Sequence, residues 1–121
     1  QVPSHLMAHY QRGSALAAIP TRAKEAEASL RRALSIRPDT VDITVALGKA
    51  LYTQKRYQAA LNEFEAALTL RPTALEALLE ASHALVALGR KGEAIQRLEQ
   101  AAKIAPNHST IATELRGLRG R

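Results

Sequence analysis

The sequence predicts an all-α fold, a right-handed α-α superhelix (solenoid) of three helix-turn-helix units followed by a C-terminal capping helix. Pro38, Pro72 and Pro106 lie 34 residues apart, which indicates an internal repeat. Ala and Leu are the commonest of the 121 residues, and both favour helix. Apolar residues also recur at the three- and four-residue steps of amphipathic helices. We expect a single domain covering residues 1–121.

The same period aligns further columns of residues. Ala26, Ala60 and Ala94 form one identical column, and Ala33, Ala67 and Ala101 form another. A small-residue column holds Ser14, Gly48 and Ser82, and a large apolar column holds Leu30, Phe64 and Leu98. These columns set the unit boundaries at about 5–38, 39–72 and 73–106, with a capping helix or truncated repeat at 107–119.

The first unit is predicted to contain helices over 5–19 and 22–36, which Pro20 and Thr21 separate. The second contains helices over 39–53 and 57–70. Asp39 is the expected N-cap of the first of these, and the break falls at 54–56.

The third unit is predicted to contain helices over 73–87 and 91–104. Thr73 and Glu76 have the spacing of a capping box, and Gly89 suits a left-handed C-cap. The last helix, over 108–118, follows Asn107 as its N-cap. Its exposed side is expected to carry Glu114, Arg116 and Arg119.

The residue sizes in the columns predict how the helices pack. Small residues should let the two helices of a pair approach closely, while the large column fills the gap between neighbouring pairs. One pair cannot bury its apolar face alone, so the pairs are expected to stack.

The chain resembles the tetratricopeptide repeat (TPR) family. The second unit matches the family pattern at Leu47, Gly48, Leu51, Tyr57, Ala60, Phe64, Ala67 and Pro72. The third unit departs at Lys91, where an aromatic is usual, and the first has Pro20-Thr21 in place of a Gly turn. The resemblance implies a non-catalytic scaffold for protein–protein interaction.

The family binds peptides along a concave groove lined by the first helix of each pair. The resemblance assigns ten residues to this groove, with Tyr52 and His83 as the expected anchors. The ten are Gln11, Asp42, Val45, Lys49, Tyr52, Glu76, Leu79, Glu80, His83 and Val86.

One subset of the family holds chaperone C-terminal carboxylates with a clamp of cations and amides. Glu76 and Glu80 stand here at clamp positions that need cations, and they would repel a carboxylate. We therefore expect a protein or peptide partner that is apolar with neutral or basic polar groups, and not a chaperone C-terminus.

Two alternatives remain. One is a structural module that either self-associates as a homo-oligomer or serves as a spacer in a larger protein. The chain's net charge of +6 also favours anionic partners, so a basic convex face could bind nucleic acid. This second alternative is the less favoured, because stacking aromatics are scarce and several cations sit in last helical turns, where the helix dipole favours them.

Catalytic, cofactor and metal sites are not predicted. The chain has no Cys, and His5 and His9 lack a third ligand nearby. No apolar run is long enough to cross a membrane, so cytoplasm and bacterial periplasm both remain open. The chain begins with Gln1, which suggests a fragment or processed form, and its excess of Ala and Arg suggests a bacterial source.

Overall fold

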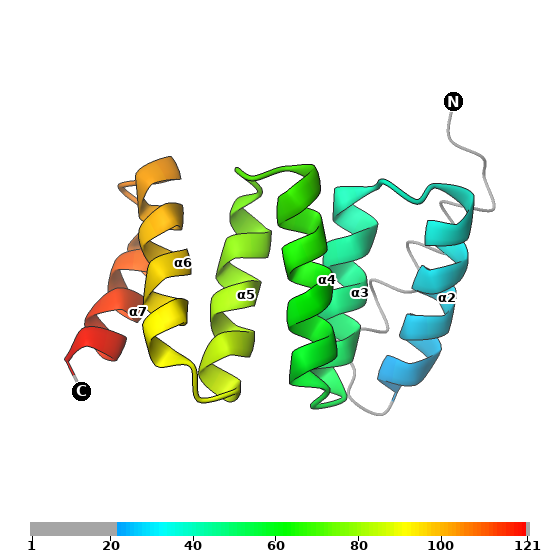
Figure 1. Cartoon of the computed structure of the whole chain (residues 1–121), viewed down its shortest axis with the longest axis horizontal. Coiled ribbons are helices and arrows are strands. Elements are labelled where there is room, and N and C mark those ends of the chain that lie inside the picture. Colours follow the sequence, from blue (N-terminus) through cyan, green and yellow to red (C-terminus); the bar gives the residue numbers. More distant parts are fainter. Residues whose placement is uncertain (1–21, 121) are drawn as a thin grey trace.

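The computed structural model describes residues 22–120. This part contains six helices and no strand: α2 (Ala23–Ile36), α3 (Val41–Thr53), α4 (Tyr57–Leu70), α5 (Leu75–Ala87), α6 (Lys91–Ile104) and α7 (Ser109–Arg119). The helices stand side by side in chain order along the longest axis, as Figure 1 shows, and consecutive helices pack on one another. The all-α stack of helix pairs is therefore confirmed. The helix expected over 5–19 lies outside the described residues.

The predicted bounds of α4 and α6 match the structure, whereas α3 and α5 each begin two residues late. The cause is a tight turn after each proline. In the turn before α5, the N–H of Ala74 donates to the carbonyl oxygen of Arg71 (3.0 Å). Before α7, the N–H of His108 donates to the carbonyl oxygen of Ala105 (3.2 Å).

The predicted side-chain caps were wrong for this reason. Asp39, Thr73 and Asn107 are used in the turns, and the N-cap residues are Thr40, Ala74 and His108. None of these three makes a side-chain capping hydrogen bond. The capping box of Thr73 and Glu76 is therefore not formed.

The expected left-handed residue at Gly89 is confirmed, with a φ of 78°. The N–H groups of Gly89 and Arg90 donate to the carbonyl oxygens of Val86 (3.0 Å) and Leu85 (2.8 Å), the two bonds of a Schellman motif. Lys55 lies one repeat earlier and adopts the same conformation, with a φ of 61°.

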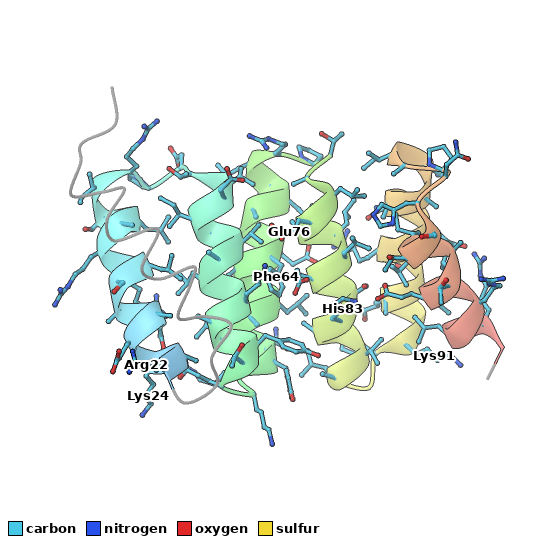
Figure 2. The ribbon with its side chains drawn as sticks, turned by 180° about the vertical axis from the view of Figure 1, so that it is seen from behind. Arg22, Lys24, Phe64, Glu76, His83 and Lys91 are labelled. Carbon is cyan, nitrogen blue, oxygen red and sulfur yellow. The ribbon has the colours of Figure 1, made fainter. Side chains whose placement is uncertain are left out.

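The two alanine columns form the centre of the stack, where all six side chains are fully buried. Phe64 is also fully buried, and its ring lies against Gly48 on the partner helix of its own pair, so the close approach expected there occurs. The large column was expected to fill the gap between pairs. The ring of Phe64 also lies inside its own pair, where Gly48 leaves room for it. Figure 2 shows Phe64 near the middle of the stack.

An ion pair connects the second helices of the last two units, α4 and α6. Arg97 of α6 donates to Glu65 of α4 (2.6 Å). The last helix is tied to α6 by an ion pair between Arg119 and Glu99. Among the described helices, none has both the length and the apolar character needed to cross a membrane.

Candidate functional site

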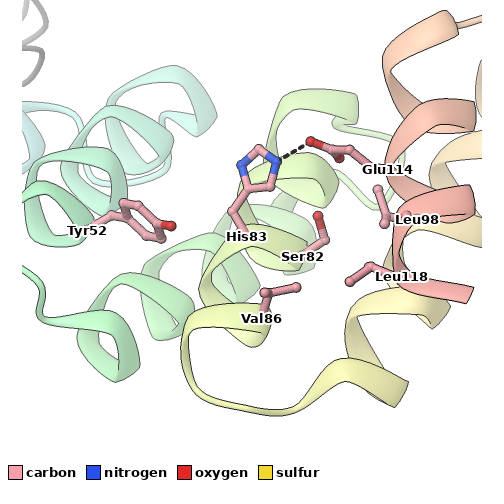
Figure 3. A pocket seen from close by; sticks show the side chains of 8 residues that line it. Tyr52, Ser82, His83, Val86, Leu98, Glu114 and Leu118 are labelled. Atoms are coloured by element: carbon pink, nitrogen blue, oxygen red, sulfur yellow. Dashed lines mark hydrogen bonds and ion pairs between the residues drawn. The ribbon is translucent and has the colours of Figure 1, made fainter. Parts of the chain in front are cut away.

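A cavity of about 280 Å³ opens where α3, α5, α6 and α7 meet. Its walls combine aliphatic side chains with a small number of polar groups. The lining residues are Tyr52, Ser82, His83, Val86, Leu98, Glu114, Gly117 and Leu118. Figure 3 shows the labelled side chains around this space, with Tyr52 on one side and Leu118 on the other. Cavities of this make-up are typical of small-ligand or side-chain binding sites.

His83 is the polar centre of the cavity. Its Nε2 lies 2.7 Å from Glu114 Oε1, a contact that joins α5 to α7, and its Nδ1 lies 3.9 Å from Glu80 Oε1. The second oxygen of Glu114, Oε2, is buried and has no hydrogen-bond partner among the described residues. Glu114 lines the cavity and its side chain is 28% exposed, but this oxygen itself has almost no surface open to solvent.

A charged rim runs from α3 to α5. Lys49 Nζ lies 3.3 Å from Glu76 Oε2. Burial raises the pKa of Glu80, the nearby Glu76 and Glu114 raise it further, and His83 and Lys49 act in the opposite direction. Burial is the largest cause of this rise, and His83 and Lys49 each affect the pKa more than Glu76 or Glu114 does.

Tyr52 supplies the aromatic wall. Its ring meets that of Tyr57 edge to face, with centroids 5.0 Å apart and an interplanar angle of 64°. Burial raises the pKa of the Tyr52 hydroxyl, and Tyr57 and Glu80 raise it further. The phenol therefore stays neutral at physiological pH and can donate or accept a hydrogen bond.

The predicted groove residues divide into several groups. Tyr52, His83 and Val86 line the cavity, and Lys49, Glu76 and Glu80 form the charged rim beside it. Asp42 is exposed in the first turn of α3 and is not among the lining residues. Leu79 is half-buried against the core. Gln11 lies outside the described residues.

The assignment of Val45 to the groove is corrected. Its side chain is only 3% exposed and belongs to the core. The residues on either side of it, Thr44 and Ala46, are buried too, so α3 is covered on more than one face. An exposed strip could not be separated from a buried one by periodicity there.

Three lining residues on α7 were missed or misplaced: Glu114, Gly117 and Leu118. Glu114 was expected on the exposed side of the capping helix, but it faces His83 on α5. The repeat columns held the signal, since Glu114 lies 34 residues after Glu80, and Gly117 lies 34 after His83. The last helix thus faces α5 at Glu114 and lines the cavity with residues at the repeat positions of a further first helix.

Metal ligands do not gather in this region. Within residues 22–120, no group of three or more His, Cys, Asp or Glu side chains could hold a metal ion. The arrangement offers a shaped space, a neutral phenol, an imidazole and carboxylates, which together suit recognition of a side chain.

Family models described as tetratricopeptide repeat match two overlapping stretches of the chain, residues 51–117 and residues 21–74. No curated protein sequence matches the chain significantly. The two matches together cover residues 21–117.

Several solved structures share the fold. The first TPR of Spaghetti (RPAP3), bound to the HSP90 peptide SRMEEVD, is 18% identical with a TM-score of 0.87, over 95% of this chain and 90% of that chain. The second TPR domain of human RPAP3, in complex with the HSP70 peptide SGPTIEEVD, is also 18% identical, with a TM-score of 0.85 over 95% of both chains. YrrB, a TPR protein with an unusual peptide-binding site, is 22% identical with a TM-score of 0.80, over 88% of this chain and 54% of that chain.

At these identities the likeness shows the fold alone. Two of the three structures hold chaperone peptides that end in EEVD. The expected exclusion of chaperone C-termini is therefore not supported by these relatives.

Proposed function

This chain belongs to the tetratricopeptide repeat family, and on that premise we propose that it is a non-catalytic scaffold that binds a segment of a partner protein. The binding surface is the groove formed by α3, α5 and α7. Its lining combines an aromatic ring, exposed aliphatic side chains and ionisable groups, the mixture that anchors a peptide and fixes its orientation.

The observation that carries the proposal is the cavity of about 280 Å³ that these three helices line together with Leu98 of α6. Val86 is 44% exposed at its edge, although it is a large aliphatic residue. Covering such a side chain with a partner is favourable, at roughly 25 cal/mol per Å² of apolar surface removed from water. That the similar solved structures bind peptides supports the same function.

The partner segment is proposed to be apolar with neutral or basic polar groups. Glu76, Glu80 and Glu114 stand along the groove, while Lys49 is already paired with Glu76. A ligand carboxylate near Glu80 and Glu114 would meet repulsion. Because related domains do bind peptides ending in EEVD, such a peptide is the decisive counter-probe.

The experiment is a selection of random displayed peptides on the full chain, followed by affinity measurement of the selected peptides and of SRMEEVD by fluorescence anisotropy. The groove variant is Val86→Gln and its matched control is Leu70→Gln, since both side chains are 44% exposed near the end of a helix. Val86→Gln should weaken binding severalfold and Leu70→Gln should not. Equal affinities for both variants would remove the groove from the proposal.

A self-associating or spacer module is the second candidate. Each second helix exposes one large aliphatic residue at the same repeat position, namely Ile36, Leu70 and Ile104. Such a row could seat another copy of the chain. Sedimentation velocity over a range of concentrations decides this, because a monomer throughout would reject self-association. Nuclease treatment and salt titration of any complex would test the remaining alternative, nucleic-acid binding.

A further inference from the structure

We propose that the cavity between α5 and α7 is a pocket for the side chain of one basic residue, lysine or arginine, in the bound segment. This inference rests on the proposed peptide-binding function and specifies its ligand. It follows from the shape of the cavity, the unused carboxylate oxygen beside it and the sign of the surrounding charges.

The walls fit the two parts of a basic side chain. Val86, Leu98 and Leu118 offer an aliphatic surface for the methylene stem, and Glu114 stands at the polar side (Figure 3). Lys and Arg bury their stems along apolar surface while the charged head stays with a polar partner. The ring of Tyr52 lines the same space and can also face a cation.

Glu114 provides the acceptor for the charged head. Its Oε1 already contacts His83 at 2.7 Å, whereas its Oε2 is buried without a hydrogen-bond partner among the described residues. A buried carboxylate oxygen without a donor is costly. If the carboxylate turns toward the cavity, an ammonium or guanidinium group would satisfy this oxygen with a charge-assisted bond. An acidic ligand group would leave the oxygen unsatisfied and add repulsion.

The charges around the cavity favour the same choice. Glu80 and Glu114 both approach His83, and Lys49, the one lysine within residues 22–120 whose charge acts on Glu80, is paired with Glu76. This acidic groove lies in a chain whose net charge is +6, so its sign is a local property. The positive charges elsewhere on the chain have little effect on a ligand in this groove, because salt screens exposed charges beyond the Debye length of about 8 Å at physiological ionic strength.

Gly117 leaves room for the guest. It occupies the repeat position that holds Lys49 in α3 and His83 in α5, so a long side chain is replaced by hydrogen. A Cβ atom at residue 117 would meet no other atom within 4 Å. The space that the side chains of Lys49 and His83 take up at the equivalent positions is therefore open beside Glu114.

The test uses the peptides selected on the full chain. Selected groove-binding peptides should share a Lys or Arg at one position, and norleucine there, which keeps the stem and removes the charge, should weaken binding about tenfold or more. Glu114→Gln should shrink that lysine-over-norleucine ratio to about twofold or less. Glu93→Gln makes the same change on an exposed acid of α6 and should leave the ratio unchanged.

Gly117→Leu is a second variant, which fills the pocket. Leucine favours helix more than glycine does and the site has free space, so α7 should remain folded while binding of the basic peptide falls at least tenfold. Circular dichroism checks the fold of each variant.

The outcomes separate the two proposals. Peptides that bind through Val86 but lack a shared basic residue, or that bind norleucine as well as lysine, would overturn the basic pocket and leave the groove function standing. The same holds if SRMEEVD binds in this cavity and keeps its affinity when its arginine is replaced by norleucine. If no peptide responds to Val86→Gln, both proposals fail together.

Discussion

The ring of Phe64 occupies the space that a side chain at residue 48 would need. A Cβ atom built on Gly48 would lie 2.7 Å from Phe64 Cδ1, and the ring is fully buried. One repeat later the same two positions hold Ser82 and Leu98. Serine is larger than the glycine at residue 48, and leucine is smaller than the phenylalanine at residue 64. The two pairs thus divide a similar volume differently.

Gly48→Ala should therefore destabilise the fold. The added methyl group forces the ring out of its rotamer or the helices apart, at a cost of about 1–3 kcal/mol that outweighs the gain in helix propensity of about 1 kcal/mol. Urea denaturation measures the loss. Gly92→Ala on α6 is the control, since a Cβ there meets nothing within 4 Å, and it should be neutral or stabilising.

The double change Gly48→Ser with Phe64→Leu should recover much of the stability lost in Gly48→Ser alone, because it reproduces the combination of the third unit. A double-mutant cycle gives the coupling energy. Additive effects of the two changes would show that the two residues do not share this volume.

Lys55→Gly should stabilise the protein. Lys55 has a φ of 61°, which lies in the left-handed region. This conformation costs a residue with a side chain about 1 kcal/mol, whereas glycine adopts it without a comparable steric cost. Gly89→Ala, at the equivalent position with a φ of 78°, should destabilise by a similar amount. Chemical denaturation of both variants tests the pair, and effects of the same sign would contradict this account.

Reversing the ion pair between α4 and α6 should be better tolerated than breaking it. Glu65→Arg and Arg97→Glu each place like charges at a 2.6 Å contact, whereas the double variant restores attraction. One repeat earlier the polarity is already reversed, since the equivalent positions hold Arg31 and Glu63, and Arg31 opposes the rise that burial causes in the pKa of Glu63.

The coupling should be at most about 1 kcal/mol, because both side chains are roughly a third exposed, and it should fall with salt. Thermal unfolding of the four proteins at low and high ionic strength measures it. A double variant less stable than both single variants would reject the pairing.

Glu80→Gln should make the protein more stable at neutral pH. Burial raises the pKa of Glu80 above 4.5 in the folded state, so protonation favours folding. That contribution is complete below the unfolded pKa and is lost as pH rises through the folded pKa. The stability gain of Glu80→Gln should therefore disappear as pH falls below about 4.5 in urea titrations.

Glu27→Gln should show the opposite dependence. Burial would raise the pKa of Glu27, but hydrogen bonds from Gln54 and Arg31 and the charges of Arg56 and Arg31 outweigh it and lower the pKa. The carboxylate thus stabilises the fold above its unfolded pKa, and this contribution is lost as pH falls through the folded value. Matching pH profiles for Glu27→Gln and Glu80→Gln would contradict these assignments.

The helices were predictable because the 34-residue period carries the same packing positions through the chain. The six buried alanines of the two columns could be named in advance, since only small side chains fit where helices cross closely. The helix starts were less accurate. Asp39, Thr73 and Asn107 have capping side chains, but each follows a proline and falls in the turn.

The site was predicted only in part. Tyr52 and His83, which the family resemblance assigned to a binding groove, line the cavity, and their role in binding stays a prediction. Val45 could not be separated from the core, because α3 is apolar on several sides. Glu114 was missed because it was expected on the solvent-exposed side of a capping helix. Its repeat position is the same as that of Glu80, which the resemblance assigned to the groove.

The order of packing has a consequence for the speed and sequence of local opening. Each helix rests chiefly on the one before and the one after it, so the stack should loosen from its ends, with amide exchange slowest in its middle helices. Since α7 packs on α6 and forms one wall of the cavity, an occupant that reaches both α5 and α7 would act as a clamp on the last helix. Slower exchange at the far end of the chain would then report that the groove is filled.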